Sequence, residues 1–392
     1  MTTIERTSLA DAVQSVAPTV REYADQSERE RRLAPPVIEA MKDAGLFRGL
    51  APESLGGAEA DPVSWFQAVE AAARIDGSFG WCLFINGSTG LIGRMLAEAD
   101  AEQLLRNRDT VLAGAVFPFG KATVTDGGFV GSGHWTYASG IPFASHVFGF
   151  AVVHDGETPR MMMPGVPAIQ ALLTPVERVE VLDTWDVSGL CATGSHDFVM
   201  HDLFIPQSNA LGLMGGPPNR YYTAPVYRLP FMTLFALPMG AVALGIAQHA
   251  IDEALELAGR KVPAGNTARL GERPLFHLQL AEAQAAVNSA RAWLHAQVAE
   301  QYELAQAGRP AELPQRNQTH LAASNATRSA AHAVELMYLA GGGTANFRRS
   351  PLQRCLRDVH AVTQHAGTSP ATWEMAGAIS AGLPPANPFI LL

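Results

Sequence analysis

Cysteine, lysine and concentrated positive charge are all scarce in this sequence. Its three cysteines, Cys82, Cys191 and Cys355, lie far apart and form no CxxC pair. This spacing argues against a disulfide framework and a zinc ribbon, and it indicates a reducing compartment. Lysine occurs three times in 392 residues, and the net charge is −9. A broad nucleic-acid surface needs clustered basic side chains, so we expect no nucleic-acid partner. The first 34 residues contain no apolar signal segment, and we therefore expect a cytoplasmic protein.

Long apolar runs are also missing, with one near exception. Positions 231–247 are almost wholly apolar and approach the length of a membrane span. Thr233, Pro238, Gly240 and Gly245 interrupt this run, and no second one follows. We expect a helix that is buried on all sides rather than a membrane protein. With 47% hydrophobic and 17% charged residues, the chain has enough apolar material for a large core.

The texture of the sequence changes twice along the chain. Residues 1–110 show apolar positions at helical spacing, and residues 111–215 consist of short β-type runs separated by glycine, proline and Asp-Gly turns. The turns at 126–128 and 155–156 are typical of hairpins. Residues 216–392 are again helical, with long alanine-rich segments that predict a bundle of four or more helices. We therefore expect an α+β protein, mainly α, with a helical domain, a β-barrel and a C-terminal bundle. A bundle this apolar also suggests an oligomer.

Most familiar catalytic signatures are absent. The chain has no P-loop, no GxGxxG after a strand, no HExxH and no GxSxG. His196 and His201 could suggest a metal site, but on a strand their side chains point to opposite faces. We expect no metal ion.

Three local stretches together resemble a known family. They are residues 131–140, residues 185–206 and residues 341–358. The second and third resemble the acyl-CoA dehydrogenase fold, which places a helical N-terminal domain before a β-barrel and a four-helix bundle. The order of units read from the texture above is the same. The resemblance extends over nearly the whole chain.

Two departures separate the chain from the dehydrogenases that it resembles. A dehydrogenase of this family needs a carboxylate base. At the positions where the resemblance places one, the chain has Arg349 and the stretch 228–231, which contains no carboxylate. The chain is instead similar to the two-component flavin-dependent monooxygenases of the same fold. Their pattern Gly-x-Trp-x-x-x-Ser-Gly occurs at residues 133–140, and their Arg-Asp followed by a histidine occurs at residues 357–365.

This resemblance implies an oxygenase that takes reduced FMN or FAD from a separate reductase. It would use O₂, through a flavin C4a-hydroperoxide, to oxygenate a small aromatic or heteroaromatic substrate. Ser139 would hold the flavin N5 without supplying a stray proton, and His365 would act as a base or hold the distal peroxide. A homotetramer or homodimer is expected. Alternatively, Ser139 simply ends a strand, and His365 is a histidine of the bundle or a C-terminal helix cap.

Several further residues are candidates for the cofactor or substrate sites. Trp135 is either a wall of the flavin site or a core residue, and Arg260 either binds the flavin phosphate or solvates a helix end. Phe117 is a further flavin-contact candidate. Four residues are expected to line the substrate pocket: Asn86, Ser88, Phe231 and Phe235. The stretch with Thr193 and Ser195 is interpreted as turn chemistry, and Arg357–Asp358 as a buried ion pair.

Two other functions remain open at this point. One is a flavin oxidoreductase of the acyl-CoA dehydrogenase type. The other is a non-catalytic relative that only binds flavin.

Overall fold

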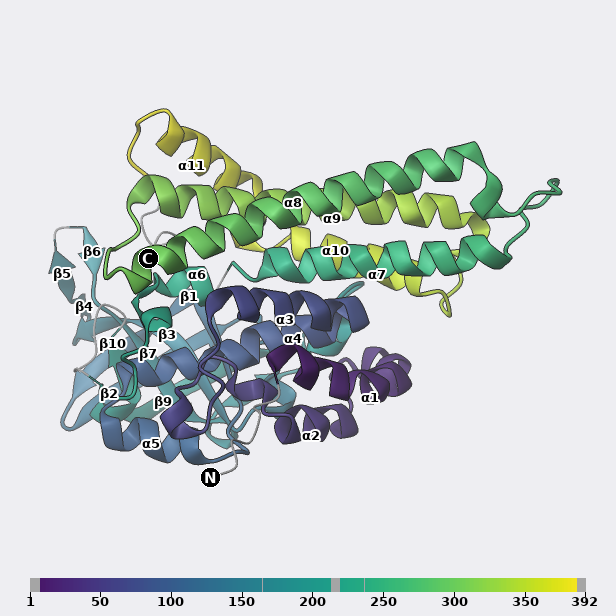
Figure 1. The fold of residues 1–392 in the computed structure, drawn as a ribbon. Helices are drawn as coiled ribbons and strands as arrows, with labels where there is room; N and C mark the ends of the chain where they lie inside the picture. Colours follow the sequence, from purple (N-terminus) through teal and green to yellow (C-terminus); the bar gives the residue numbers. More distant parts are fainter. Residues whose placement is uncertain (1–7, 164, 213–218, 236, 386–392) are drawn as a thin grey trace, which may run out of the picture.

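The N-terminal part of the protein is helical, as expected. The structure is a computed structural model that describes residues 8–163, 165–212, 219–235 and 237–385. Proline at the start of a helix and glycine after its end were the signals used for residues 35–45. The helix found there begins at Pro35 and ends at Asp43, with Gly45 at a φ of 70°. The helices of this part are α1 (Leu9–Glu30), α2 (Pro35–Asp43), α3 (Pro62–Ile75), α4 (Gly77–Ser88) and α5 (Glu98–Arg106) (Figure 1).

The middle of the chain forms one mixed sheet. Its strand order is β10-β7-β3-β1-β2-β9-β8, with β1 and β3 parallel and the other neighbours antiparallel. The hairpin predicted at 126–128 joins β1 to β2, and the one predicted at 155–156 joins β3 to β4. The strands are β1 (Leu112–Thr125), β2 (Gly128–Trp135), β3 (His146–Asp155), β4 (Thr158–Pro159), β7 (Ile169–Pro175), β8 (Glu180–Leu182), β9 (Asp197–Pro206) and β10 (Ala210–Gly212), with β5 (Met161–Met163) and β6 (Val166–Pro167) in a separate pair.

This sheet curls around its own apolar core. Side chains from β1, β2, β3, β7 and β9 share one hydrophobic cluster. Leu172 of β7 lies so close to Gly131 of β2 that a Cβ at Gly131 would come within 2.7 Å of it. The predicted barrel is thus a strongly curled sheet, whose path of paired strands runs from β10 to β8.

The C-terminal part is a helical bundle. In Figure 1, α7, α8 and α9 run alongside one another, and α10 packs against α7 and α9. The apolar run at 231–247 is divided between α6 and α7, and residues 239–247 are all buried. Within the part of the chain that the structure describes, one stretch, 231–260, is long and apolar enough to cross a membrane, but 81% of its apolar window is buried inside the protein. The helices are α6 (Phe231–Phe235), α7 (Met239–Arg260), α8 (Pro274–Gln306), α9 (Leu313–Gly341), α10 (Pro351–Thr363) and α11 (Pro370–Ser380).

Candidate functional site

Ser139 lies in a tight turn that follows strand β2. Tyr137, with a φ of 63°, and Gly140, with a φ of 80°, both adopt left-handed backbone conformations, and they reverse the chain after the strand. The N–H of Ala138 donates to the carbonyl of His196 (3.0 Å), and the N–H of Gly140 donates to that of Thr193 (2.8 Å). The turn is therefore attached by its backbone to the stretch 193–196. Strain at Tyr137 is stored next to the candidate catalytic serine.

The hydroxyl of Ser139 belongs to a buried chain of polar groups. It accepts a hydrogen bond from Nε1 of Trp81 (3.0 Å), and its Oγ lies 2.8 Å from Oγ of Ser195. Ser195 is 2.7 Å from Oγ1 of Thr193, which donates to the carbonyl of Leu190 (2.8 Å). All five residues are buried. Thr193 and Ser195 are thus direct partners of the candidate site, which the interpretation of this stretch as turn chemistry had missed.

Trp81 connects the two candidate catalytic residues. It lies on α4, with its indole N–H toward Ser139 and its ring edge-on to His365, at 5.7 Å between centroids and 66° between planes. Phe84 packs against the same ring at 5.5 Å. The structure therefore brings Ser139 and His365 to one place, as the resemblance implied. In the sequence Trp81 stands in an apolar run, and nothing there distinguishes it from a core residue.

His365 is neutral in this arrangement, and one of its ring nitrogens already accepts a hydrogen bond. Its Nδ1 accepts the N–H of Gly367 (3.1 Å) and so caps the short helix at residues 366–368. A backbone N–H can only donate, so Nδ1 carries no proton and the neutral ring has its proton on Nε2. Burial lowers the pKa of His365 to about 4. His365 thus caps the start of a short helix and not the C-terminal end of α10, whose cap is Gln364. Its Nε2–H leaves it able to donate a hydrogen bond to a bound group.

Asn86 holds the backbone of Ser139 in place. It is fully buried, and its Nδ2 donates to the carbonyls of Leu112 (2.9 Å) and Ser139 (3.0 Å). Its Oδ1 is buried without a hydrogen-bond partner in the described chain. A Cβ at Gly140 would come within 2.5 Å of this amide, so glycine is required there. Ser88 is also fully buried, and its hydroxyl donates to the carbonyl of Phe84 within its own helix.

The remaining aromatic candidates have different surroundings. Trp135 is completely buried, its indole N–H donates to the carbonyl of Phe150 (2.9 Å), and its ring stacks on Phe198 at 5.1 Å between centroids. These surroundings are those of a core residue of the sheet. Phe117 is 46% exposed on β1, where the pairing with β3 is interrupted. Phe231 packs against both the helical core and a small core beside the sheet. The side chain of Phe235 lies outside the described part of the structure.

Two arginines lie at the far ends of helices from the cluster around Ser139. The segment at Gly367 packs against Met239, the first residue of α7. Arg260 is the last residue of the same helix, and a rise of 1.5 Å per residue places it about 30 Å from Met239. Arg260 is exposed and pairs with Glu256 (3.5 Å). Arg349 precedes α10 and His365 follows it, so about 20 Å separates them. Arg349 therefore lies at the opposite end of α10 from His365.

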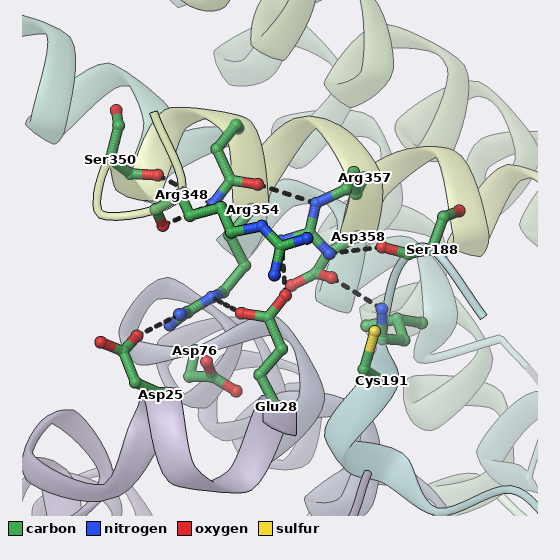
Figure 2. Close-up of polar contacts among 12 residues, drawn as sticks. Asp25, Glu28, Asp76, Ser188, Cys191, Arg348, Ser350, Arg354, Arg357 and Asp358 are labelled. Carbon is green, nitrogen blue, oxygen red and sulfur yellow. Dashed lines mark hydrogen bonds and ion pairs between the residues drawn. The ribbon is translucent and has the colours of Figure 1, made fainter. Parts of the chain in front are cut away.

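The predicted ion pair between Arg357 and Asp358 is replaced by a larger polar cluster (Figure 2). Arg357 pairs with Glu28 (2.6 Å), and Asp358 accepts the N–H of Leu190 (2.6 Å). Burial, followed by the charge of Asp76, raises the pKa of Asp358 to about 7. Through Asp358, helix α10 thus holds the loop that carries Thr193 and Ser195. Asp358 itself stands seven residues before His365 in the sequence. Arg354 completes the cluster through Glu28 (2.7 Å) and Asp25.

Comparisons with known proteins place this geometry in a family. The chain matches the acyl-CoA dehydrogenase N-terminal domain over residues 3–106 and the acyl-CoA dehydrogenase C-terminal domain over residues 237–370. It is 33% identical to an indole-3-acetate monooxygenase of Pseudomonas putida, covering 95% of this chain and 94% of that protein. It is 32% identical to the oxygenase subunit HsaA of a flavin-dependent monooxygenase from Rhodococcus jostii, covering 94% and 97%. The solved structure of a 3-HSA hydroxylase from Rhodococcus sp. RHA1 superimposes with a TM-score of 0.90 at 29% identity, covering 99% and 100%.

Proposed function

The chain belongs to the acyl-CoA dehydrogenase family, in the branch of the flavin-dependent monooxygenases, and on this premise we propose its reaction. It is the oxygenase component of a two-component system, which receives reduced FMN or FAD from a separate reductase. With O₂ it oxygenates a small aromatic or heteroaromatic molecule. The observation that carries the proposal is the cluster in which Ser139 and His365 meet at Trp81.

The groups around Ser139 fit a reduced flavin. The site offers Nε2–H of His365 as a donor, the hydroxyl of Ser139, and the buried Oδ1 of Asn86, which has no partner in the described chain. An isoalloxazine edge carries both N–H groups and carbonyl oxygens, so it can satisfy donors and acceptors of this kind. When bound, the reduced flavin supplies the electrons that activate O₂. Ser139, Asn86 and His365 would hold it.

The protein residues would contribute orientation and the exclusion of protons. Trp81 fixes the hydroxyl of Ser139, and Asn86 fixes its backbone carbonyl. His365 stays uncharged at neutral pH because burial lowers its pKa to about 4, so it donates a hydrogen bond without acting as an acid. The aromatic rings of Trp81 and Phe84 keep water from this side of the cluster.

Dehydrogenation of an acyl thioester is less well supported by the same geometry. It needs a carboxylate base, yet in the described chain no Asp or Glu makes a hydrogen bond or ion pair with Ser139, Trp81 or His365. Burial is the one cause of the lowered pKa of His365, whereas a neighbouring carboxylate would raise that pKa. The dehydrogenase alternative predicts a yellow protein that reduces an artificial electron acceptor without oxygen. The oxygenase predicts a largely colourless protein.

A second copy of the chain is part of this proposal. Arg260 lies at the opposite end of α7 from Met239, which packs against the segment of Gly367, so in this proposal it serves the flavin of another copy. Exposed apolar side chains on or beside the long bundle helices provide a surface for such a contact: Leu255, Leu275, Leu278, Leu339 and Phe347. We propose a homotetramer or homodimer on this basis. The three buried free thiols agree with action in the cytoplasm.

Stopped-flow oxidation of reduced flavin tests the proposal. Chemically reduced FMN or FAD is bound to the protein without oxygen and mixed with O₂, with and without a panel of phenols, indoles and thiophenes. We expect the long-lived absorbance of a C4a-hydroperoxide and, with an accepted substrate, an oxygenated product. Ser139→Ala should shorten the lifetime of that absorbance. If wild-type protein oxidises reduced flavin at the rate of free flavin and forms no product, the proposed function is wrong.

A further inference from the structure

The chain of hydroxyls at Ser139 has only one possible direction for its protons. A serine or threonine hydroxyl has one proton to donate. Oγ1 of Thr193 lies 2.8 Å from the carbonyl oxygen of Leu190, and a carbonyl can only accept. Two oxygens at this distance with no proton between them would repel each other, so the proton of Thr193 must point to Leu190.

This assignment passes along the chain to Ser139. Since the proton of Thr193 is used, Ser195 is the donor in its 2.7 Å contact with Thr193. The proton of Ser195 is then used as well, so Ser139 is the donor in its 2.8 Å contact with Ser195. The indole N–H of Trp81 takes one lone pair of Ser139. Ser139 is left with a single free position, which can only accept a hydrogen bond.

The far end of the chain is held by the fold. Leu190 has a φ of 52°, and its N–H donates to Asp358 of α10 (2.6 Å). Its carbonyl also accepts the indole N–H of Trp185 (3.2 Å). The loop lies so close to α10 that a Cβ at Gly189 would come within 2.1 Å of the carbonyl oxygen of Arg357. The carbonyl that fixes the direction of the protons is thus itself fixed in place.

We propose that Thr193 and Ser195 are positioning residues that make Ser139 an obligate acceptor, so that the site binds reduced flavin in preference to oxidised flavin. This inference rests on the proposed function, in which Ser139 faces the flavin N5. In reduced flavin N5 carries a hydrogen and donates, whereas in oxidised flavin N5 has only a lone pair. An obligate acceptor stabilises the first and repels the second. The oxygenase would thereby capture the reduced cofactor and release the oxidised one.

Dissociation constants of the two redox states test this directly. They are measured under anaerobic conditions for FMN and FAD, oxidised and chemically reduced, with wild-type protein and three variants. Thr193→Val and Ser195→Ala each free the proton of Ser139, which can then point to an oxidised N5. Thr193→Ser keeps the hydroxyl and is the matched control. Melting temperatures show which variants fold, and Ser195→Ala carries the test if Thr193→Val does not.

We expect wild-type protein and Thr193→Ser to bind reduced flavin more tightly. Thr193→Val and Ser195→Ala should reduce this preference by about tenfold, the effect of one hydrogen bond. For a two-electron couple, such a change lowers the reduction potential of the bound flavin by about 30 mV. If wild-type protein prefers reduced flavin but the variants keep that preference, the inference is wrong and the proposed function stands. Equal wild-type affinity for both states also overturns the inference, and no binding of either state overturns both.

Discussion

Asp358 should make the stability of this protein fall between pH 5 and pH 8. Burial and the charge of Asp76 raise the pKa of Asp358 from 3.8 to about 7, against the opposing effects of Leu190, Arg357 and Arg354. Because the pKa is higher in the folded chain, its contribution to stability is complete below pH 3.8 and is lost as the pH rises through 7. Each pH unit between these values costs about 1.4 kcal/mol, so pH 5 to 7 costs about 3 kcal/mol.

The change that tests this is Asp358→Asn, whose side-chain oxygen can still accept the N–H of Leu190. An unfolding entropy of about 2 cal/mol/K per residue gives about 4 °C for this free energy in a chain of this length. We expect the wild-type melting temperature to fall by about 4 °C more than that of the variant between pH 5 and pH 8. Asp76→Asn keeps the cap of α4 but removes the charge, so it should move the wild-type fall to lower pH. Parallel curves for wild type and Asp358→Asn would refute the reasoning.

Three further predictions concern the site itself. Trp81→Phe keeps a ring against His365 but loses the N–H donated to Ser139, so hydrogen peroxide release per reduced flavin should rise several-fold; an unchanged yield contradicts the role of this donor. The pKa of His365 is depressed from 6.5 to about 4, so its contribution to the stability of the fold is present above pH 6.5 and is lost as the pH falls through 4. For the same reason, a pH profile of product formation should show no ionisation of this residue near pH 6.5. Gly140→Ala should lower the melting temperature more than Gly127→Ala, because both have a positive φ but only Gly140 would also clash with a neighbouring amide; equal losses would show that backbone strain alone decides.

The local patterns of the sequence were enough to predict the architecture. Helical periodicity, Asp-Gly turns and the change of texture near residues 110 and 215 depend on interactions between near neighbours, and the corresponding helices and strands are found. The turn at Gly127 and the start of α2 at Pro35 follow from the backbone preferences of single residues. The order of strands in the sheet could not be predicted. Strand β3 pairs in parallel with β1, although β2 lies between them in the sequence, and β2 pairs with the other edge of β1.

The site was predicted only in part, for a related reason. Ser139 and His365 were found because they stand in patterns that a family shares. Trp81 and Asn86 were missed as their neighbours, since each belongs to an apolar run of α4 and reaches Ser139 only through the packing of α4 against the sheet. Ser195 was interpreted as part of a turn because serine beside glycine is common in turns. The sequence around it does not show that its hydroxyl lies next to that of Ser139 in the fold.

The polar cluster of Figure 2 and the site around Ser139 are connected through the same two helices, α4 and α10. Asp76 caps α4, the helix of Trp81, and Asp358 lies on α10, which leads to His365. Near pH 7 the carboxyl of Asp358 begins to carry charge opposite Asp76, and the repulsion acts between the two helices that hold the site together. His365 is already neutral at this pH. A loss of oxygenation above pH 7 should therefore disappear in Asp358→Asn, and if it persists in that variant its origin lies elsewhere in the site.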